Sequence, residues 1–204
     1  MTNEAIISID TSSGNTDMEL TDNFSYDIID ENEPILTRKA KVVTFENQEE
    51  VEKVCSNLVK TAKKLNLLSL TATQCGIDMN IVVVGYDDKY VAFCNSEYDV
   101  LGDEYVDAKE MSATERYVAV NIKRPKHIHV RYKDFRGEEK EVNISGLTCR
   151  YFLHGYDILQ GKKLLDNFSG LKRKLEIERK NKLKKKLTRL SKKYKKSLSN
   201  ISTK

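Results

Sequence analysis

The residues best suited to chemistry lie in one short segment, where Arg150, His154 and Asp157 follow one another at steps of four and three. Residues 147–161 read LTCRYFLHGYDILQG, and this pattern predicts a helix over about 147–159 that ends near Gly161. An imidazole can bind a metal ion or accept a proton. One neutral imidazole holds a divalent ion poorly, however, because catalytic metal sites have about three protein ligands. His154 therefore needs partners from elsewhere in the chain.

Other candidates for chemistry are weaker. His127 and His129 share one face of a predicted strand, but no acid or thiol at a suitable spacing completes a metal site, so we expect a structural or surface role for them. The sequence contains no phosphate loop, no G-x-G-x-x-G and no G-x-S-x-G elbow. The cysteines lie far apart without metal-ligand spacing, which favours a reducing compartment over a zinc ribbon or a disulfide framework. They are Cys55, Cys75, Cys94 and Cys149.

The elements that must position these residues follow one another in the order helix, strands, helix. Apolar residues at steps of three and four predict a helix over about 47–66. Period-two patterns predict strands over 81–86, 90–94, 117–122, 127–133 and 140–144, with a hairpin turn at 134–137. This order favours an α+β fold over a doubly wound parallel sheet. Short alternating pieces before residue 33, such as 5–9, could pair as an edge strand.

The segment 147–161 resembles the metal-binding helix of peptide deformylases, whose pattern is roughly Q-H-E-x-D-H-L-x-G. Three further stretches resemble that family in the same order, and the resemblance covers residues 34–165. It implies a deformylase-like α+β domain with antiparallel or mixed sheets around a central helix. The matching stretches are 35–43 with Arg38, Ala40 and Val43, 70–76 with Leu70, Gln74 and Gly76, and 92–96 with Asn95, while Arg124 and Pro125 fix the register of Glu110 and Ser112.

The departures from the family pattern fall on the chemistry. The resemblance implies that one Cys and two His bind the family's metal and that a Glu acts as acid and base. Ser112, His154 and Ile158 occupy the ligand positions here, and Gly155 occupies the position of the Glu. Gln74, an oxyanion donor in the family, is retained. We therefore expect no metal, no other cofactor and no catalytic residue.

His154 is expected to be a leftover imidazole whose hydrogen bonds are satisfied by Gln74 or Glu110. Catalysis by Ser112 and His154 as a nucleophile–base pair is formally possible. We do not favour it, because Asp157 is poorly placed to reach the ring.

The formal charge of +4 conceals three unlike segments. Residues 1–37 hold nine acids and no base, residues 38–170 hold 20 of each sign, and residues 171–204 hold 15 bases and two acids, so −9, 0 and +13 sum to +4. This segregation predicts an acidic N-terminal arm (1–33), the deformylase-like domain (34–165) and a basic helical tail (166–204). No apolar run approaches 18 residues, and the first residues do not resemble a secretory signal, so neither membrane nor export is expected.

The tail is expected to form a helix that a partner must cover. Its apolar residues recur at steps of three and four and form a narrow seam among lysines, as in a helix that docks on an acidic groove. The acidic arm offers complementary charge, from the same molecule or from a neighbouring copy. The residues assigned to this interface are Leu183, Leu187, Leu190, Tyr194 and Leu198, with Lys184, Lys185 and Lys186.

Together these features favour a non-catalytic structural or assembly protein that binds other subunits through its charged arms. Deformylase-like genes occur in tailed phages, which suggests a baseplate component, assembled in the host cytoplasm and then carried in the virion. One alternative is a metal-dependent deformylase that removes formyl groups from nascent peptides. Another is a protein that binds RNA or the ribosome, because bacterial deformylases approach the ribosome through a basic C-terminal helix.

Overall fold

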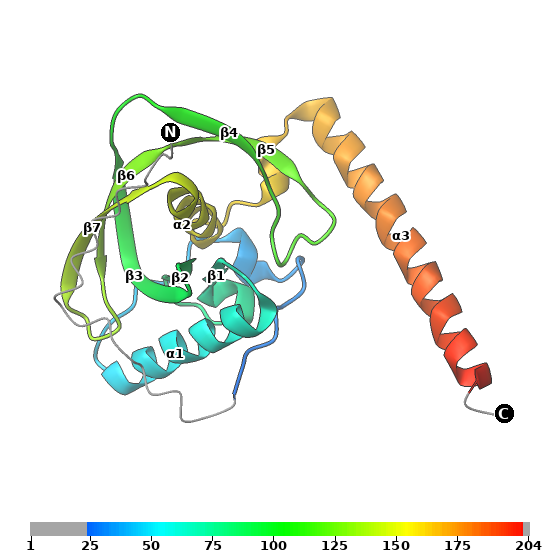
Figure 1. Cartoon of the computed structure of the whole chain (residues 1–204), viewed down its shortest axis with the longest axis horizontal. Helices are drawn as coiled ribbons and strands as arrows, with labels where there is room; N and C mark the ends of the chain where they lie inside the picture. Colours follow the sequence, from blue (N-terminus) through cyan, green and yellow to red (C-terminus); the bar gives the residue numbers. More distant parts are fainter. Residues whose placement is uncertain (1–23, 202–204) are drawn as a thin grey trace.

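The structure is a computed structural model that describes the backbone of residues 24–201 and the side chains as far as residue 194 (Figure 1). Three α-helices, seven strands and three short 3-10 helices follow one another along this part of the chain. They are η1 (Pro34–Thr37), α1 (Gln48–Leu65), β1 (Ser69–Thr71), η2 (Ala72–Cys75), β2 (Ile81–Tyr86), β3 (Lys89–Val100), β4 (Tyr105–Glu110), β5 (Val120–Pro125), β6 (His127–Lys133), β7 (Glu139–Ser145), α2 (Gly146–Leu159), η3 (Leu164–Asn167) and α3 (Gly170–Ile201).

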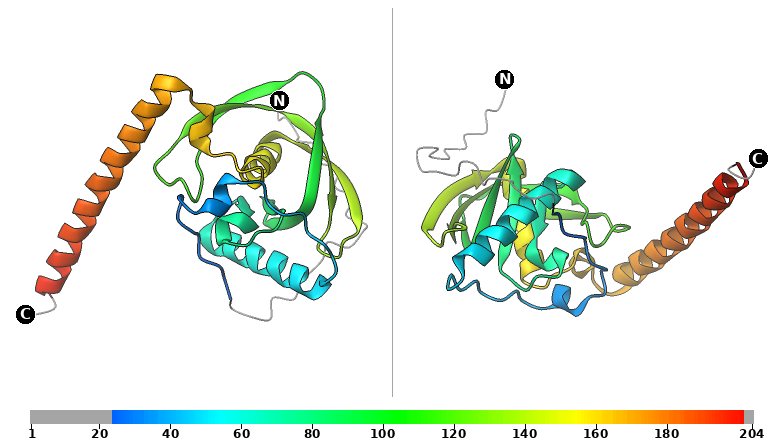
Figure 2. Two further views of the ribbon diagram at one scale, coloured as in Figure 1. Left: turned by 180° about the vertical axis from the view of Figure 1, so that it is seen from behind. Right: turned by 90° about the horizontal axis from the view of Figure 1, so that it is seen from below.

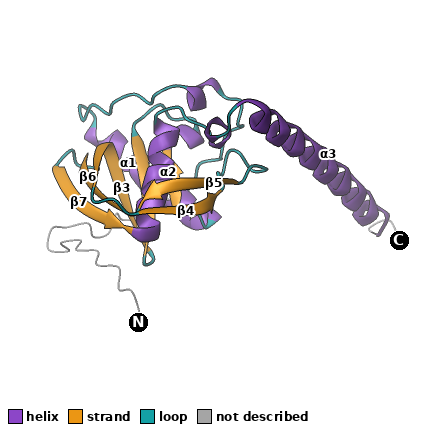
Figure 3. Ribbon diagram, turned by 90° about the horizontal axis from the view of Figure 1, so that it is seen from above, coloured by secondary structure: helices purple, strands orange, loops and turns teal. Residues whose placement is uncertain are grey.

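Two antiparallel sheets form the framework. The larger sheet has the strand order β1-β2-β3-β6-β7, and β4 pairs with β5 in a separate two-stranded sheet. Strand β3 is long and changes register between Cys94 and Glu97, where a bulge bends it. Figure 3 shows the strands of both sheets gathered around α2, which contacts β1 and β2 in the larger sheet and β5 in the smaller one.

The two inner helices pack on opposite faces of the larger sheet. Helix α1 begins at Asn47, whose side chain caps it by accepting a hydrogen bond from the Glu50 amide, and it buries Val51 and Leu58 against one face. Helix α2 buries Phe152 and Leu153 against the other face. The hydrophobic core is therefore divided by the sheet, and α2 lies at the centre of the domain with strands around it (Figure 1).

The sequence patterns predicted most of these elements. The helices predicted over 47–66 and 147–159, the strands over 81–86, 127–133 and 140–144 and the turn at 134–137 are all present within two residues of the predicted bounds. The tail predicted over 166–204 is helical over Gly170–Ile201. The α+β class and the central helix are confirmed as well. The edge strand suggested near residues 5–9 lies outside the described residues.

Four strands differ from the prediction. Strand β1 was not predicted, and the strand predicted over 90–94 forms the longer β3, which continues to Val100. The strand predicted over 117–122 begins at Val120 instead, because Glu115 holds the preceding residues in a turn: its carboxylate accepts from the Leu164 amide, and its carbonyl accepts from the Val118 amide. Val118 is buried, but against η3 rather than in a strand. Strand β4 was not predicted at all, since residues 105–110 mix polar and apolar types and five of the six are not buried.

Gly155 allows α2 to approach the larger sheet closely. A Cβ atom at this position would lie 2.4 Å from Val82 Cγ2 and 2.9 Å from Ser69 Oγ. Both distances are shorter than carbon contacts in folded proteins allow. Although Gly costs about 1 kcal/mol relative to Ala within a helix, its lack of a side chain is what permits this packing.

Helix α3 extends away from the domain (Figure 2). All of its described side chains are exposed except those of Glu176 and Lys180. No helix in the described part of the chain is long and apolar enough to cross a membrane.

We predict that Gly155→Ala destabilises the fold even though Ala is the better helix former. The added methyl group must displace Val82 or Ser69, and overpacking of this kind costs about 1–3 kcal/mol. The free energy of unfolding, measured in urea, should fall accordingly. In a Val82→Ala background the same substitution should cost less, because the clashing methyl groups are gone. Equal costs in both backgrounds would contradict the close approach.

Candidate functional site

The candidate site is organised around the carboxylate of Glu110, at the end of β4. Its side chain is 5% exposed, and Arg124 on β5, 8% exposed, binds it through two nitrogens. Arg124 Nε lies 2.6 Å from Oε1 and Nη2 lies 2.9 Å from Oε2. The third nitrogen, Nη1, donates to Asp157 on α2 at 2.9 Å. A bidentate pair of this kind is among the strongest polar contacts in proteins, and here it joins the small sheet to α2.

Arg150 on α2 completes the charge balance. Its Nη1 donates to Glu110 Oε1 at 2.7 Å and to the Ile122 carbonyl at 2.9 Å, and its Nη2 donates to the Val106 carbonyl at 2.6 Å. The two guanidinium groups and the carboxylates of Glu110 and Asp157 thus form a neutral set. Arg150 at the same time satisfies carbonyl groups of both β4 and β5, so it serves the fold.

His154, one turn beyond Arg150, points at the same carboxylate. Its Nδ1 lies 3.1 Å from Glu110 Oε2, which confirms one of the two partners expected from the sequence. Because an ionised carboxylate only accepts hydrogen bonds, Nδ1 carries the proton. In a neutral ring, Nε2 then keeps its lone pair.

The network keeps Glu110 ionised. Burial acts to raise the pKa of this carboxyl group, but the hydrogen bonds from His154 and Arg124 and the charge of Arg124 outweigh burial and lower the pKa to about 2. Burial acts to lower the pKa of Arg124, but the hydrogen bonds to Glu110 and Asp157 and the charges of these two carboxylates outweigh burial. The pKa of Arg124 is therefore raised. Glu110 is therefore a fixed negative charge at neutral pH rather than a proton donor.

Gln74 and Ser112 form a second polar group. Gln74 caps η2: its Oε1 accepts from the Thr71 amide at 3.0 Å, and its Nε2 donates to Ser112 Oγ at 3.4 Å. Ser112 Oγ also lies 3.1 Å from Thr114 Oγ1. Gln74 therefore binds Thr71 and Ser112 rather than His154. The hydroxyl group of Ser112 is engaged with an amide and a second hydroxyl group, not with a base.

The donors present do not fit a catalytic metal. Of the three positions at which the resemblance places ligands, Ile158 has no lone pair, and Ser112 carries a hydroxyl group in place of a thiolate. His154 Nε2 is one donor where about three are needed. In the part of the chain that the structure describes, no three His, Cys, Asp or Glu side chains are grouped so that they could hold an ion.

A cavity of about 140 Å³ lies beside His154. Charged side chains make up most of its wall, and Ile158 contributes an apolar surface. Such a space can admit a few water molecules or a small polar group. The remaining residues that line it are Arg124, Asp157, Lys162, Lys163, Leu164, Asp166 and Asn167.

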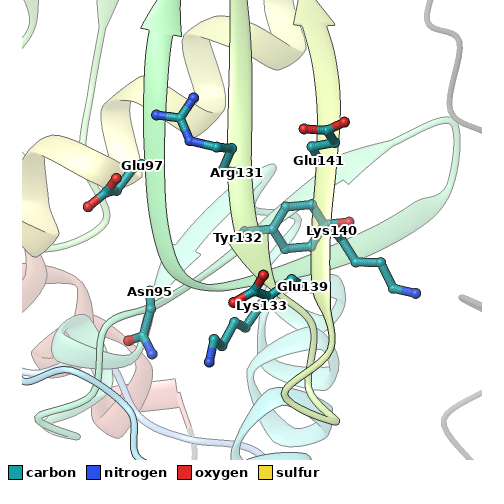
Figure 4. A pocket seen from close by; sticks show the side chains of 8 residues that line it. All are labelled: Asn95, Glu97, Arg131, Tyr132, Lys133, Glu139, Lys140 and Glu141. Atoms are coloured by element: carbon teal, nitrogen blue, oxygen red, sulfur yellow. The ribbon is translucent and has the colours of Figure 1, made fainter.

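A larger hollow of about 500 Å³ lies elsewhere, on the face of β6 and β7 beyond α1 (Figure 4). Arg131 is paired across the strands with Glu141, and Lys133 with Glu139. Its six charged side chains, three of each sign, balance one another, so we assign the hollow to the solvated face of the sheet. The other residues lining it are Asn95, Glu97, Tyr132 and Lys140.

The remaining candidates have structural roles. His129 Nδ1 lies 2.8 Å from Asn143 Oδ1, and its Nε2 lies 3.4 Å from Glu141. The cysteines are all reduced. Burial raises the pKa of Cys75 and of Cys149 to about 12, so neither thiol is a ready nucleophile at neutral pH.

Sequence reasoning missed the roles of Arg124 and Arg150 in the network. A signal for Arg124 was present, because Val120, Ile122 and Arg124 alternate on the inward face of β5. A charged residue that continues an apolar period-two pattern must find a buried partner of opposite charge. The partner could not be identified without the pairing of β4 with β5.

We predict that Glu110→Gln is strongly destabilising at neutral pH, by about 3–5 kcal/mol, because it leaves two buried guanidinium groups without their carboxylate. The folded-state pKa of about 2 lies below the ordinary value of 4.5. The stabilisation by Glu110 is therefore complete above about pH 4.5 and is lost as the pH falls toward 2. Urea unfolding of both proteins at pH 7 and pH 3 should show the difference narrowing in acid.

The matched control is Glu104→Gln, which removes an exposed carboxylate 2.6 Å from Lys126. Surface pairs contribute at most about 1 kcal/mol, so this variant should differ little from the unmodified chain. Similar losses in the two variants would contradict the central role of Glu110.

Comparison with known proteins identifies the fold and the family. The sequence profile of the polypeptide deformylase family matches residues 25–174. The peptide deformylase of Thermotoga maritima is 32% identical over 143 residues, which cover 70% of this chain and 87% of the relative. That of Rickettsia typhi is 28% identical over 169 residues, covering 78% of this chain and 96% of the relative.

Solved structures agree. The crystal structure of the Thermotoga maritima peptide deformylase superposes with a TM-score of 0.67 at 30% identity and covers 72% of this chain and 99% of its own. The Legionella pneumophila enzyme reaches a TM-score of 0.71 at 21% identity, covers 81% of this chain and 99% of its own, and supports the fold. With a matching profile over most of its length and such relatives, the chain belongs to the polypeptide deformylase family.

Proposed function

We propose that this chain is a non-catalytic member of the deformylase family, which uses the fold as a scaffold and binds another protein through α3. The observation that carries the proposal is the packing at Gly155. This position corresponds to the acid–base Glu of the family, and a side chain there would overlap Val82 and Ser69. The close packing of α2 on β2 leaves no room for a side chain at this position.

The ligand positions support the same conclusion. At Ser112 and Ile158, a hydroxyl group and a sec-butyl side chain stand where the family has a thiolate and an imidazole. Activation of water by a metal requires an ion held by about three donors, and a general acid or base must then move the proton. Neither requirement is met by the side chains that converge near His154.

Helix α3 is the element best suited to binding. Its base is fixed to the domain by ion pairs of Lys180 with Glu31, at 2.5 Å, and of Arg173 with Asp166, at 2.9 Å. Beyond this anchor, Leu183, Leu187 and Leu190 are exposed among lysines. A narrow apolar seam on a projecting basic helix suits an acidic protein groove better than solvent.

Deformylase activity is the main competing function, and family membership favours it because the relatives are named peptide deformylases. One local observation also favours it. A carboxylate that accepts from Nδ1 of a histidine, as Glu110 does here, is the usual support for an imidazole whose other nitrogen binds a metal. We interpret this pair as an inherited support that now serves the ion-pair network.

RNA or ribosome binding is a second alternative, favoured by the lysines of α3. Phosphate contacts need charge but no apolar seam, so the exposed leucines argue for a protein partner. Assembly into a phage baseplate, with its virion location, stays a prediction from the sequence. The relatives compared above are bacterial enzymes and do not bear on it.

We predict that the purified chain, supplied with Fe²⁺, Zn²⁺ or Ni²⁺ and then desalted, retains well below one metal ion per molecule and releases no formate from a formyl-methionyl peptide. The reason is the single donor at His154. Elemental analysis and a formate assay on the same sample provide the measurement. One ion per chain together with formate release would establish the enzyme instead.

A gain-of-binding variant makes this negative result interpretable. Ser112→Cys with Ile158→His supplies the two missing donors beside His154, and we expect it to retain Zn²⁺ at close to one ion per chain. It should remain inactive, because Gly155 is unchanged and no group replaces the acid–base Glu. The same assays on both proteins separate failure to bind metal from failure of the assay.

We also predict that affinity capture with the intact chain, from nuclease-treated extracts of its native source, retains a defined protein that is lost with Leu187→Ser/Leu190→Ser. Burying two leucines contributes about 3 kcal/mol or more, which corresponds to more than a hundredfold in affinity. Quantitative mass spectrometry of the captured material provides the measurement.

The matched control is Leu171→Ser/Leu175→Ser, which changes two exposed leucines at the base of the same helix, about a quarter to a third of a turn around it from the centre of the seam. It should capture the partner normally. Capture that is seen only when nuclease is omitted from the extract, and that is unaffected by either leucine pair, would favour RNA.

A further inference from the structure

The described part of the acidic arm already acts as the counter-charge of α3. The carboxylate of Glu31 lies 2.5 Å from Lys180 Nζ and 4.0 Å from Lys184 Nζ, and its carbonyl accepts from Lys163 Nζ at 2.7 Å. The side chains of Glu31 and Lys180 are each 13% exposed. Contact between the two oppositely charged ends of the chain is therefore built into the fold.

The apolar seam of α3 continues the face that makes this contact. Leu183, Leu187 and Leu190 follow Lys180 at steps of three, four and three, which places them within about 80° of it around the helix. Their side chains are 40%, 42% and 51% exposed. The seam thus faces the same side as the anchored residues, rather than away from the domain.

A groove of about 340 Å³ leads from the domain to this face. One wall is residues 28–31 of the acidic arm, the second is the loop before β5, and Lys184 of α3 closes the third side. Its lining therefore combines apolar side chains with charges of both signs. The lining residues are Ile28, Ile29, Asp30, Glu31, Thr114, Arg116, Tyr117 and Lys184.

Groove and seam together specify the chemistry of an occupant. It must be acidic, because the region from residue 182 to residue 196 carries nine Lys or Arg and no acid. It must also present apolar side chains, because exposed leucines gain free energy when they leave water. A nucleic acid satisfies the first condition and not the second.

Residues 1–23 of the same chain satisfy both conditions. They contain five acids (Glu4, Asp10, Asp17, Glu19 and Asp22) and no base, together with an apolar cluster at 5–9 and a second at 18–20. Fully extended, 23 residues reach about 75 Å, whereas α3 is about 48 Å long. The covalent link also gives the segment an effective concentration in the millimolar range.

We propose that residues 1–23 dock along the seam formed by Leu183, Leu187 and Leu190 on α3 of their own chain. This contact would add to that of Glu31, from which it is separated by residues 25 and 26, held on α1 by Lys64 and Thr61. The inference goes beyond the proposed function and does not depend on it. An active enzyme could carry the same intramolecular contact.

Zero-length crosslinking of the full-length chain tests the proposal, because carbodiimide joins only carboxylates and amines that are already in contact. We expect links from acids of residues 1–23 to lysines of 182–196, identified by mass spectrometry after digestion. The pairs Glu31–Lys180 and Glu104–Lys126, at 2.5 and 2.6 Å, are internal positive controls. Formation of the control links without the expected ones would overturn the proposal.

Two further measurements separate the proposed contact from other causes. In Leu187→Ser/Leu190→Ser the new links should fall about tenfold or more, because apolar docking is lost, while Leu171→Ser/Leu175→Ser leaves them unchanged. Unchanged links in the first variant would reduce the contact to non-specific charge attraction. In an equal mixture of ¹⁴N- and ¹⁵N-labelled chains, links of mixed isotope would assign the contact to a second copy, also against the proposal.

Discussion

The buried carboxylate of Glu110 is the constraint around which the domain is arranged. A charge removed from water must be matched by opposite charge and by hydrogen bonds. Here the match requires Arg124 from β5 and Arg150 and His154 from α2. These three side chains approach Glu110 from two different elements. The small sheet and the central helix are therefore fixed relative to one another by a single group.

The same network distinguishes the residues of the candidate site that hold the fold together from those that do not. The supports of the old site, Glu110 and Arg150, also hold β4 and β5 to α2, so their loss would cost stability whatever the protein does. Of the positions at which the resemblance places ligands, His154 belongs to this network, whereas Ser112 bonds to Gln74 and Thr114 and Ile158 lines the adjacent cavity. At 155 the absence of a side chain allows α2 to lie close to β2.

The sequence predicted the parts of the structure that depend on periodicity. The amphipathic pattern of α1, the apolar run of β2 and the turn at Gly137, with its positive φ, are local features, and they were placed to within a residue or two. Strand β4 could not be predicted, because its stability comes from pairing with β5 and from the carbonyl contacts of Arg150 rather than from its own composition. The partner of His154 was narrowed to two residues. The partner is Glu110 rather than Gln74, because the Gln74 side chain accepts a hydrogen bond from the Thr71 amide at the start of η2.

The contacts at the base of α3 give a physical reason for the segregation of charge along the chain. The many lysines of α3 repel one another, because the helix contains few acids. Among its described side chains, Arg179 and Glu176 form an ion pair at 3.7 Å. Countercharge must then come from outside the helix. Glu31 provides the first of it, at a site shielded enough for the ion pair to resist screening by salt. The acids of the N-terminal arm are better understood as the other half of this electrostatic balance than as an independent feature. On that basis the ion pair of Glu31 with Lys180 is the contact through which the oppositely charged ends of the chain meet.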